Sequence, residues 1–323
     1  MPSPRRRAEA DADPTPYKTK AAGSMGAIKN QKPGLKNPER LYARYSGVPV
    51  VYVESDEDHY VFGECWFQTQ AARLEFRPVS RRDFAGETTA GCHAVIEAVR
   101  DERLAGNSAW GIVDRDALFS QCCWDLVHEV DDEAFAHAAP FGSHVKVLLR
   151  WEMESYLIDA AAIEKYLGER QLRVPRSDEE GWVDLMADCL ALIPHAALNA
   201  VRHELNEKGL GDGRTDAMSD RTAVEEQLIE KDLTSLERRH GACRQRYAHF
   251  LQAAEYFDRP DGPPRERVIS LLRRIHGKAV LSRIQSRHRT GDIKGHLAAS
   301  IRTLNRVPDE LHEFVDRVIR DEK

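Results

Sequence analysis

Two short apolar runs that end in carboxylates constrain the fold more than any other feature of this chain. Residues 48–54 have the sequence Val-Pro-Val-Val-Tyr-Val-Glu, and residues 109–116 have Ala-Trp-Gly-Ile-Val-Asp-Arg-Asp. Apolar runs of strand length that are followed by helix-like segments are typical of buried parallel strands. In an open α/β sheet, ligands bind at the carboxyl ends of such strands. We therefore expect Glu54, Asp114 and Asp116 to converge at one edge of a sheet.

The order of the expected elements indicates an α/β fold followed by helices. Expected strands and helices alternate over residues 41–158, which predicts a mainly parallel sheet with helices on both faces. From residue 159 to 323 the periodicity is helical only, which predicts an all-helical C-terminal domain. The expected strands are 48–54, 74–79, 108–113, 126–130 and 144–149; the expected helices are 56–70, 92–104, 160–167, 180–193, 196–208, 221–257 with a break at Gly241, 265–275, 278–286, 293–304 and 309–320.

The N-terminus and the cysteines bear on the location of the protein. Residues 1–40 are rich in Pro, Lys, Arg, Ala and Gly without apolar periodicity, so we expect a disordered basic tail rather than a secretory signal. No apolar run has the length needed to cross a bilayer. The six cysteines form no C-x-x-C pair and no zinc spacing, which favours reduced thiols. These features predict a cytoplasmic protein without a membrane segment.

The net charge of −6 hides an asymmetry along the chain. Residues 234–306 contain sixteen Lys or Arg against six Asp or Glu, a net charge of +10, so the remainder carries −16. A sustained basic excess predicts contact with a polyanion such as nucleic acid, although a charged run can also be a solvated face. The candidate nucleic-acid-binding residues are Arg273, Arg274, Lys278, Arg283, Arg287 and Arg289.

The grouped carboxylates predict a metal site. Like charges that lie close together repel unless something positive joins them, and hard oxygen ligands suit Mg²⁺ or Mn²⁺. A single acid after a strand is commonly a helix cap, and Asp56 and Asp58 have that alternative. An Asp-x-Asp after one strand that is matched by a Glu after another is less often structural. No phosphate-binding G-x-x-x-x-G-K-[ST] loop occurs, so we expect no ATP hydrolysis by this chain.

These residues resemble the Toprim fold, the shared catalytic domain of topoisomerases, primases and OLD-type nucleases. Residues 53–58, Val-Glu-Ser-Asp-Glu-Asp, resemble the family's Glu-Gly-x-x-Asp, with Ser55 where Gly is usual. Residues 114–116 resemble its Asp-x-Asp. The greatest similarity is to the Toprim-like effectors that are paired with OLD-type ATPases in bacterial anti-phage defence, the PARIS-like kind. Three further segments support it: residues 91–94, residues 151–157 and Gly277-Lys278.

The resemblance implies roles for individual residues. It implies that Glu54 is a metal ligand or general acid/base, and that Asp114 and Asp116 hold one or two Mg²⁺ ions. Asp58 and Glu154 would complete the metal site. Lys278 follows a glycine and would stabilise a scissile phosphate. If a helix begins near Trp151, residues two apart point to different sides, so only one of Glu152 and Glu154 can join the site, and the resemblance selects Glu154.

Three functional hypotheses remain open at this point. The first is a Mg²⁺-dependent nuclease that cleaves RNA, including transfer RNA, or DNA. By resemblance, it would be a toxic antiviral effector controlled by an ATPase partner of the OLD/ABC type. The chain could also form a homodimer. The second is a non-catalytic module that binds nucleic acid or a protein partner. The third is a phosphoryl-transfer enzyme that acts on small nucleotides, since an Asp-x-Asp site can act on small nucleotides as well as on nucleic-acid polymers.

Overall fold

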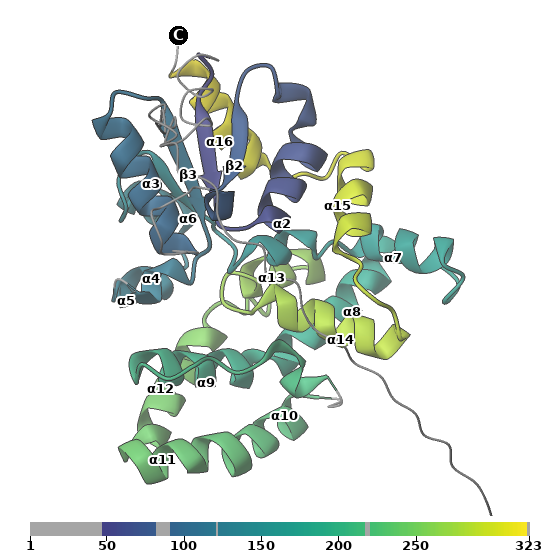
Figure 1. Cartoon of the computed structure of the whole chain (residues 1–323). Coiled ribbons are helices and arrows are strands. Elements are labelled where there is room, and N and C mark those ends of the chain that lie inside the picture. The colour runs from purple at the N-terminus through teal and green to yellow at the C-terminus, as the bar shows by residue number, and fades with distance from the viewer. Residues whose placement is uncertain (1–46, 82–90, 121, 217–219, 322–323) are drawn as a thin grey trace, which may run out of the picture. The chain divides into compact units, whose positions relative to one another are not determined.

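Four parallel strands form one sheet in the computed structural model, which describes residues 47–81, 91–120, 122–216 and 220–321 (Figure 1). The strands are β1 (Val50–Val53), β2 (Glu75–Pro78), β3 (Ala109–Val113) and β4 (Val145–Val147), in the spatial order β2-β1-β3-β4. This arrangement confirms the expected α/β class and the parallel sheet. The expected tail over residues 1–40 lies outside the described residues.

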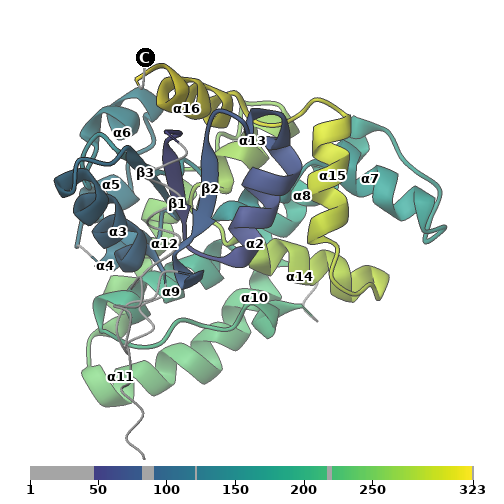
Figure 2. The same ribbon diagram turned by 45° about the horizontal axis from the view of Figure 1, so that its top comes forward.

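Helices cover both faces of the sheet, which explains why the two central strands, β1 and β3, are apolar throughout. Along β1, Val51 and Val53 belong to one hydrophobic cluster, and Val50 and Tyr52 belong to another. Helix α3 (Cys92–Leu104) covers the second face, and a Cβ atom at Gly111 would lie 2.8 Å from a Val95 methyl carbon, so the absence of a side chain lets this helix approach. The π-helical segment η1 (His59–Trp66) and helix α16 (Asp309–Arg320) cover the first face (Figure 2).

The expected strand over residues 126–130 is wrong. This segment contains the end of α5 (Trp124–Val127) and leads into α6 (Asp132–Ala138), after the short helix α4 (Ala117–Ser120). The carbonyl groups of Leu126 and Glu129 accept hydrogen bonds from the Arg115 guanidinium, at 3.0 and 2.7 Å, rather than from a neighbouring strand. A side-chain contact from Arg115, which lies 11 and 14 residues earlier in the chain, therefore overrides the apolar character of this short run.

The remaining elements of the first half follow the expected pattern with local differences. The expected helix over residues 56–70 is divided into α2 (Asp56–Asp58), η1 and the 3₁₀ turn η2 (Gln68–Gln70). Ser55 caps α2 in a reciprocal capping box with Asp58. A 3₁₀ turn, η3 (Val79–Arg81), follows β2. Another, η4 (Met153–Leu157), follows β4 and carries residues that matter for the candidate site.

The second half is helical, as expected. The expected long helix over residues 221–257 is interrupted at Gly241, whose φ of +64° lies in the left-handed region that glycine adopts readily. The elements are α7 (Ala160–Glu169), α8 (Asp178–Ala191), α9 (Ile193–Glu204), η5 (Asp212–Thr215), α10 (Arg221–Leu228), η6 (Ile229–Leu233), α11 (Thr234–His240), α12 (Cys243–Glu255), α13 (Pro264–Leu271), α14 (Gly277–His288), α15 (Lys294–Thr303) and α16.

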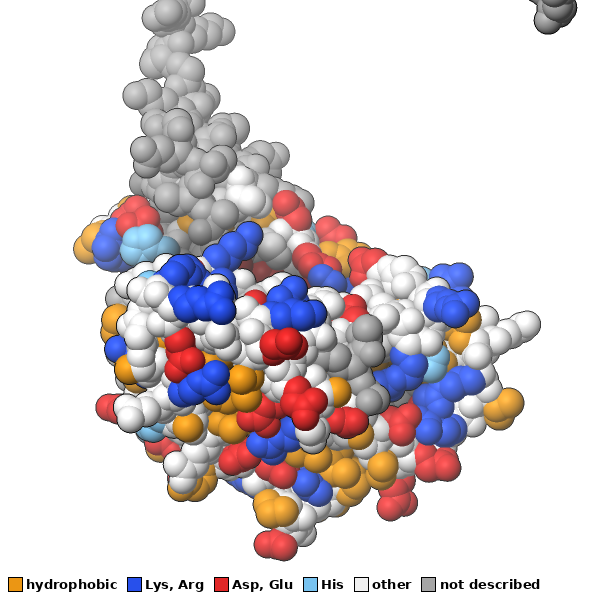
Figure 3. Space-filling model, turned by 90° about the horizontal axis from the view of Figure 1, so that it is seen from below, with side chains coloured by type: hydrophobic (Ala, Val, Ile, Leu, Met, Phe, Trp, Pro, Cys, Tyr) orange, Lys and Arg blue, Asp and Glu red, His pale blue; other side chains and the backbone are white. Residues whose placement is uncertain are grey.

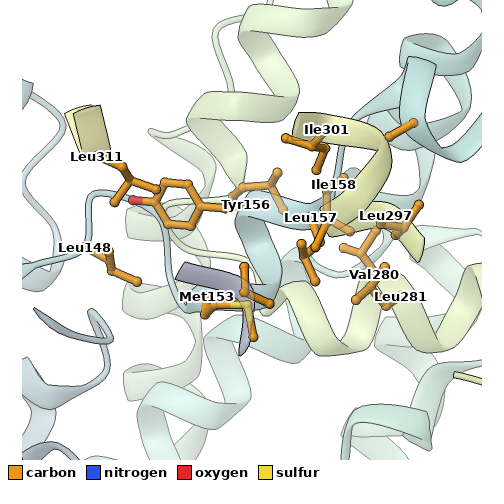
Figure 4. Packing of buried hydrophobic residues seen from close by; sticks show 14 of the residues in the cluster. Leu148, Met153, Tyr156, Leu157, Ile158, Val280, Leu281, Leu297, Ile301 and Leu311 are labelled. Atoms are coloured by element: carbon orange, nitrogen blue, oxygen red, sulfur yellow. The ribbon is translucent and has the colours of Figure 1, made fainter. Parts of the chain in front are cut away.

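The C-terminal helices share their core with the sheet, so the expected boundary after residue 158 does not separate two cores. Trp110 of β3 packs edge-on against Phe314 of α16, with ring centroids 6.1 Å apart. The Trp66 indole of η1 donates to the Ala298 carbonyl of α15 at 3.0 Å. Figure 4 shows the part of this core around η4, where the labelled residues are Leu148, Met153, Tyr156, Leu157, Ile158, Val280, Leu281, Leu297, Ile301 and Leu311.

One helical stretch of the described residues, Asp178–Glu204, has the length and composition of a membrane span. It comprises α8 and α9, which the sequence patterns predict as two separate helices. Within the fold, 72% of its most apolar window is buried. Burial of this kind is expected for a core helix of a soluble protein, and it accounts for the apolar composition without a bilayer.

Candidate active site

Carboxylates gather where β1 and β3 end. The two strands are parallel neighbours, with Val50 opposite Ala109 and Tyr52 opposite Gly111. Their carboxyl ends therefore lie side by side, and the Asp114 backbone N–H donates to Glu54 Oε1 at 2.9 Å. The structure thus brings together two of the acids that the sequence places after different strands.

The segment after β4 contributes two more acids. The Met153 N–H at the start of η4 donates to Asp114 Oδ1 at 3.0 Å, which joins η4 to the end of β3. Lys278 Nζ lies 3.1 Å from Glu152 Oε2 and 3.5 Å from Glu154 Oε2. The expectation that only one of these glutamates reaches the site is wrong. Glu152 has extended backbone angles (φ −153°, ψ 170°) and lies outside the helical turn, so the spacing rule for a helix surface does not apply to the pair.

A close contact between backbones places Lys278. A Cβ atom at Gly277 would lie 2.3 Å from the Ser155 nitrogen and 2.6 Å from the Glu154 carbonyl carbon, so only glycine fits against η4. The Lys278 N–H donates to Glu152 Oε1 at 2.7 Å, in addition to the contacts of its ammonium group. The Gly-Lys pair that the sequence singles out therefore lies beside the acids because its glycine lets α14 begin against η4.

Two residues near the acids are not signalled by any sequence motif. Lys294, the first residue of α15, donates to Glu154 Oε1 at 3.1 Å and to Glu57 Oε2 at 2.7 Å. Asp212 of η5 interacts electrostatically with Lys278 and Glu154, and burial raises its pKa. Both belong to helical elements far along the chain, and only the tertiary fold brings them to the strand ends.

The turn between the two aspartates is held by the arginine between them. Arg115 is fully buried, and its guanidinium donates to backbone carbonyls. Its guanidinium donates to the Leu149 carbonyl at 2.9 Å and lies 4.1 Å from the centre of the Phe135 ring. Its backbone N–H donates to the Trp151 carbonyl at 2.9 Å. These contacts fix the Asp-Arg-Asp turn between β3 and the chain that leads into η4.

Proximity and loss of hydration raise the pKa values of these acids together. Burial raises the pKa of Glu54 to about 7, helped by the charges of Asp116 and Asp58 and opposed by the Asp114 N–H. Burial likewise raises the pKa of Glu152 to about 7 against the opposing charge of Lys278. The pKa of Asp114 is raised well above its usual range by burial and by Glu54.

Asp58 and Asp116 shift in the same direction. Burial and the Glu154 charge raise the pKa of Asp58 to about 6, although the Ser55 hydroxyl hydrogen bond opposes the shift. The side chain of Asp116 is exposed, but surrounding protein removes part of its hydration and raises its pKa, while Lys278 lowers it. Burial alone would lower the pKa of Lys278, yet Glu152, Glu154 and Asp114 raise it above its ordinary value. The group therefore carries excess negative charge that Lys278 and Lys294 balance only in part.

The acids are of the kind that holds Mg²⁺ or Mn²⁺, but their oxygens have other partners. Within the described ranges, no three His, Cys, Asp or Glu side chains are placed to hold one metal ion. Glu54 Oε1 and Asp114 Oδ1 accept from backbone N–H groups, as does Asp58 Oδ2, which accepts from Ser55 at 2.9 Å. Carboxylate oxygens are suitable ligands for a divalent cation, and the raised pKa values of these acids indicate mutual repulsion that a cation would relieve.

Three of the expected nucleic-acid-binding arginines are buried, so that expectation is wrong for them. Arg273 donates to the Val130 carbonyl at 2.7 Å and pairs with Asp132. Arg274 is fully buried, and its guanidinium lies 4.8 Å from the centre of the Trp151 ring. Arg283 Nε donates to Asp188 Oδ1 at 3.0 Å. Their guanidinium groups make contacts inside the fold. A charge count along the sequence cannot distinguish such buried arginines from exposed ones.

The exposed basic residues do not form a continuous area on the face shown in Figure 3, where basic and acidic side chains are intermingled. Arg287 and Arg289 are exposed near the C-terminal end of α14, and Arg287 pairs with Asp188 at 2.5 Å. Lys278 lies at the other end of this helix, among the carboxylates. Of the six residues expected to contact a polyanion, Lys278, Arg287 and Arg289 are the three that remain accessible to a polyanion.

Comparisons with models of protein families, with curated proteins and with solved structures gave no match for this chain.

Proposed function

We propose that the carboxylates at the strand ends are the active site of a Mg²⁺-dependent nuclease. One observation carries the proposal: acids from the ends of three neighbouring parallel strands lie around a single lysine, and the pKa values of Glu54, Asp114 and Glu152 are all raised. A purely structural ion-pair network would be expected to balance its charges. Here the acids outnumber the nearby ammonium groups, which favours binding of a further cation.

The residues divide into metal-binding and phosphate-binding roles. Once their side chains turn toward one ion, Glu54, Asp114 and Asp116 would hold Mg²⁺ or Mn²⁺, with Asp58 and Glu154 completing the set. A bound divalent ion lowers the pKa of a water molecule and stabilises charge on phosphate oxygens. Glu152 orients Lys278 by contacting both its backbone N–H and its ammonium group. Lys278 would donate a hydrogen bond to a phosphate oxygen and stabilise negative charge there.

The nature of the substrate rests on charge and on the resemblance to Toprim-like effectors. Arg287 and Arg289 lie roughly 14–17 Å along α14 from Lys278, a distance that a nucleic-acid backbone spans in a few nucleotides. Their exposure favours a polymeric substrate, RNA such as transfer RNA or DNA, over a mononucleotide. The resemblance alone supports a role in antiviral defence and control by an OLD-type ATPase.

A second candidate, a non-catalytic binding module, is favoured by the way the acids are paired. The Lys294 ammonium lies between Glu57 and Glu154, and Lys278 lies between Glu152 and Glu154. Lysines in these positions offset part of the charge that a metal ion would otherwise balance. A module of this kind would bind nucleic acid or a protein partner without cleaving it and without response to Mg²⁺.

Cleavage and calorimetry together distinguish the two candidates. We expect the full chain to cleave labelled transfer RNA or single-stranded DNA with Mg²⁺ and to gain thermal stability from the ion. Glu54→Gln and Asp114→Asn should lose both responses, whereas Glu64→Gln, which changes an exposed carboxylate of η1, should keep them. Equal Mg²⁺ stabilisation in all four proteins would contradict a metal site at the strand ends. Metal-independent binding without cleavage would establish the binding module.

A further inference from the structure

Lys294 joins the segments that follow two strands through its ammonium group. Its Nζ donates to Glu57 Oε2 in α2, which follows β1, at 2.7 Å, and to Glu154 Oε1 in η4, which follows β4, at 3.1 Å. Glu154 is only 3% exposed, so its carboxylate needs positive charge close by. Burial alone would lower the pKa of Lys294, yet Glu57 and Glu154 raise it. A charged ammonium group therefore lies between two carboxylates.

The fold fixes the backbone of Lys294 but not the end of its side chain. Ile293, the residue before it, is 1% exposed, and the Trp66 indole of η1 donates to the Ala298 carbonyl one turn further along α15 at 3.0 Å. Figure 2 shows α15 beside the segment that contains α2. The Lys294 side chain is 23% exposed, and a flexible stem of four carbons carries its ammonium group. The ammonium group can therefore change partners while α15 stays in place.

The two lysines that contact Glu154 are held differently. Lys278 contacts Glu152 through its backbone N–H at 2.7 Å and through its ammonium group at 3.1 Å, so it stays beside Glu152 even without Glu154. The other partner of Lys294 is Glu57, whose side chain is 39% exposed and which is not among the proposed metal ligands. If Glu154 binds a metal ion, Lys294 can keep its contact with Glu57 at the edge of the site.

We propose that Lys294 is a built-in counter-ion of Glu154 that a divalent cation must displace, so that this lysine sets the metal affinity of the site. The inference rests on the proposed metal site at the strand ends. An ammonium group at hydrogen-bond distance occupies one oxygen of the carboxylate and repels a second cation. In the part of the chain that the structure describes, no three side chains stand ready to hold one ion, as expected for a site that an ammonium group occupies. Lys294 is a positioning residue, because it acts through Glu154.

Calorimetric melting of the full chain at increasing Mg²⁺ concentration tests this competition. Lys294→Met keeps most of the side chain and removes its charge. Without metal it should melt below the wild type, and Mg²⁺ should then raise its melting temperature more, with half of the effect at a concentration about tenfold lower or less. Lys294→Gln, which can still donate a hydrogen bond, repeats the test with a smaller loss of stability. Lys294→Arg, which keeps the charge, and Lys165→Met, which removes a lysine paired with Glu169 on α7, should respond like the wild type.

The possible results separate this inference from the proposed function. An equal Mg²⁺ response in the wild type and Lys294→Met would overturn the inference and leave the metal site intact. A weaker response in Lys294→Met would overturn it too, because Lys294 would then help to form the metal site. Equal gains in Lys294→Met and Lys165→Met would reduce the effect to net charge. A response in Lys294→Met alone would support the inference but contradict a Mg²⁺-dependent wild type, and no response in any of these proteins would overturn both.

Discussion

The carboxyl of Glu54 lies in an environment that favours its protonated form. Its position beside Asp58, Asp114 and Asp116 follows from strand order, since β1 and β3 are parallel neighbours whose ends coincide. The Asp114 N–H is the main interaction that favours the ionised form, and it does not offset burial. The raised pKa of Glu54 therefore reflects the excess of negative over positive charge in the whole site.

This balance predicts a pH dependence of stability. The pKa of Glu54 is about 7 in the folded protein against 4.5 for an ordinary glutamate, so the folded state holds a proton that the unfolded chain releases. Its contribution to stability is therefore present below pH 4.5 and is lost as the pH rises to 7. Calorimetry without divalent metal should show a melting temperature that falls over this range. In Glu54→Gln the fall should be smaller, and in Glu64→Gln it should match the wild type; a Glu54→Gln curve parallel to the wild type would contradict the raised pKa.

At the scale of elements, the junction between η4 and α14 positions the lysine. Sequence patterns predict a helix starting after Gly277, but not that its first turn lies against η4. Ser155 and Glu154 approach Gly277 so closely that their backbone atoms occupy the volume a Cβ would need. The contact places the first N–H groups of α14 toward Glu152, and the Lys278 N–H donates to it.

Gly277→Ala should therefore change both stability and the site. Overpacking against backbone, which cannot rotate away, is expected to cost about 1–3 kcal/mol of unfolding free energy. Denaturant unfolding measures this loss, and the Mg²⁺ response of the variant should weaken because Lys278 and η4 move apart. Gly291→Ala is the matched control, since nothing lies within 4 Å of a Cβ at that position. Equal stability of the two variants would contradict the close contact.

At the scale of the whole molecule, the basic excess of residues 234–306 is divided between the core and the surface. Arg283 is 3% exposed and lies between Asp188 and the Thr215 carbonyl. Arg289 lies on the same helical segment but is exposed. The fold thus uses some of the positive charge internally, to neutralise acids buried by packing of α8 against α14.

The two arginines should respond differently to substitution. Arg283→Ala leaves Asp188 buried with Arg287 as its remaining partner, so we expect a loss of about 3 kcal/mol in unfolding free energy. Arg289→Ala should change stability by less than about 0.5 kcal/mol. If the exposed end of α14 contacts nucleic acid, Arg289→Ala should reduce the salt dependence of binding by about one counterion. An unchanged salt slope would mean that Arg289 is only solvated.

The sequence by itself determined the parallel strands, most of the helices and the placement of acids after β1 and β3. These features are local: apolar runs, helical periodicity, and Gly or Pro at element ends. The Gly277-Lys278 pair was singled out by the resemblance to Toprim-like effectors. No local sequence pattern indicates where this pair lies in the fold. The incorrect strand over residues 126–130 shows the limit, because its carbonyl groups bind a side chain from β3's end.

Only the tertiary structure decided which charges are buried and which acids share a partner. Arg274 and Arg289 are equivalent in a charge count, yet one is enclosed by aromatic rings and the other is exposed. Glu152 and Glu154 both reach Lys278 because an extended residue precedes a 3₁₀ turn, a detail that packing against α14 sets. Burial and pairing depend on residues more than a hundred positions apart, and contacts at that separation leave no periodic trace in the chain that forms them.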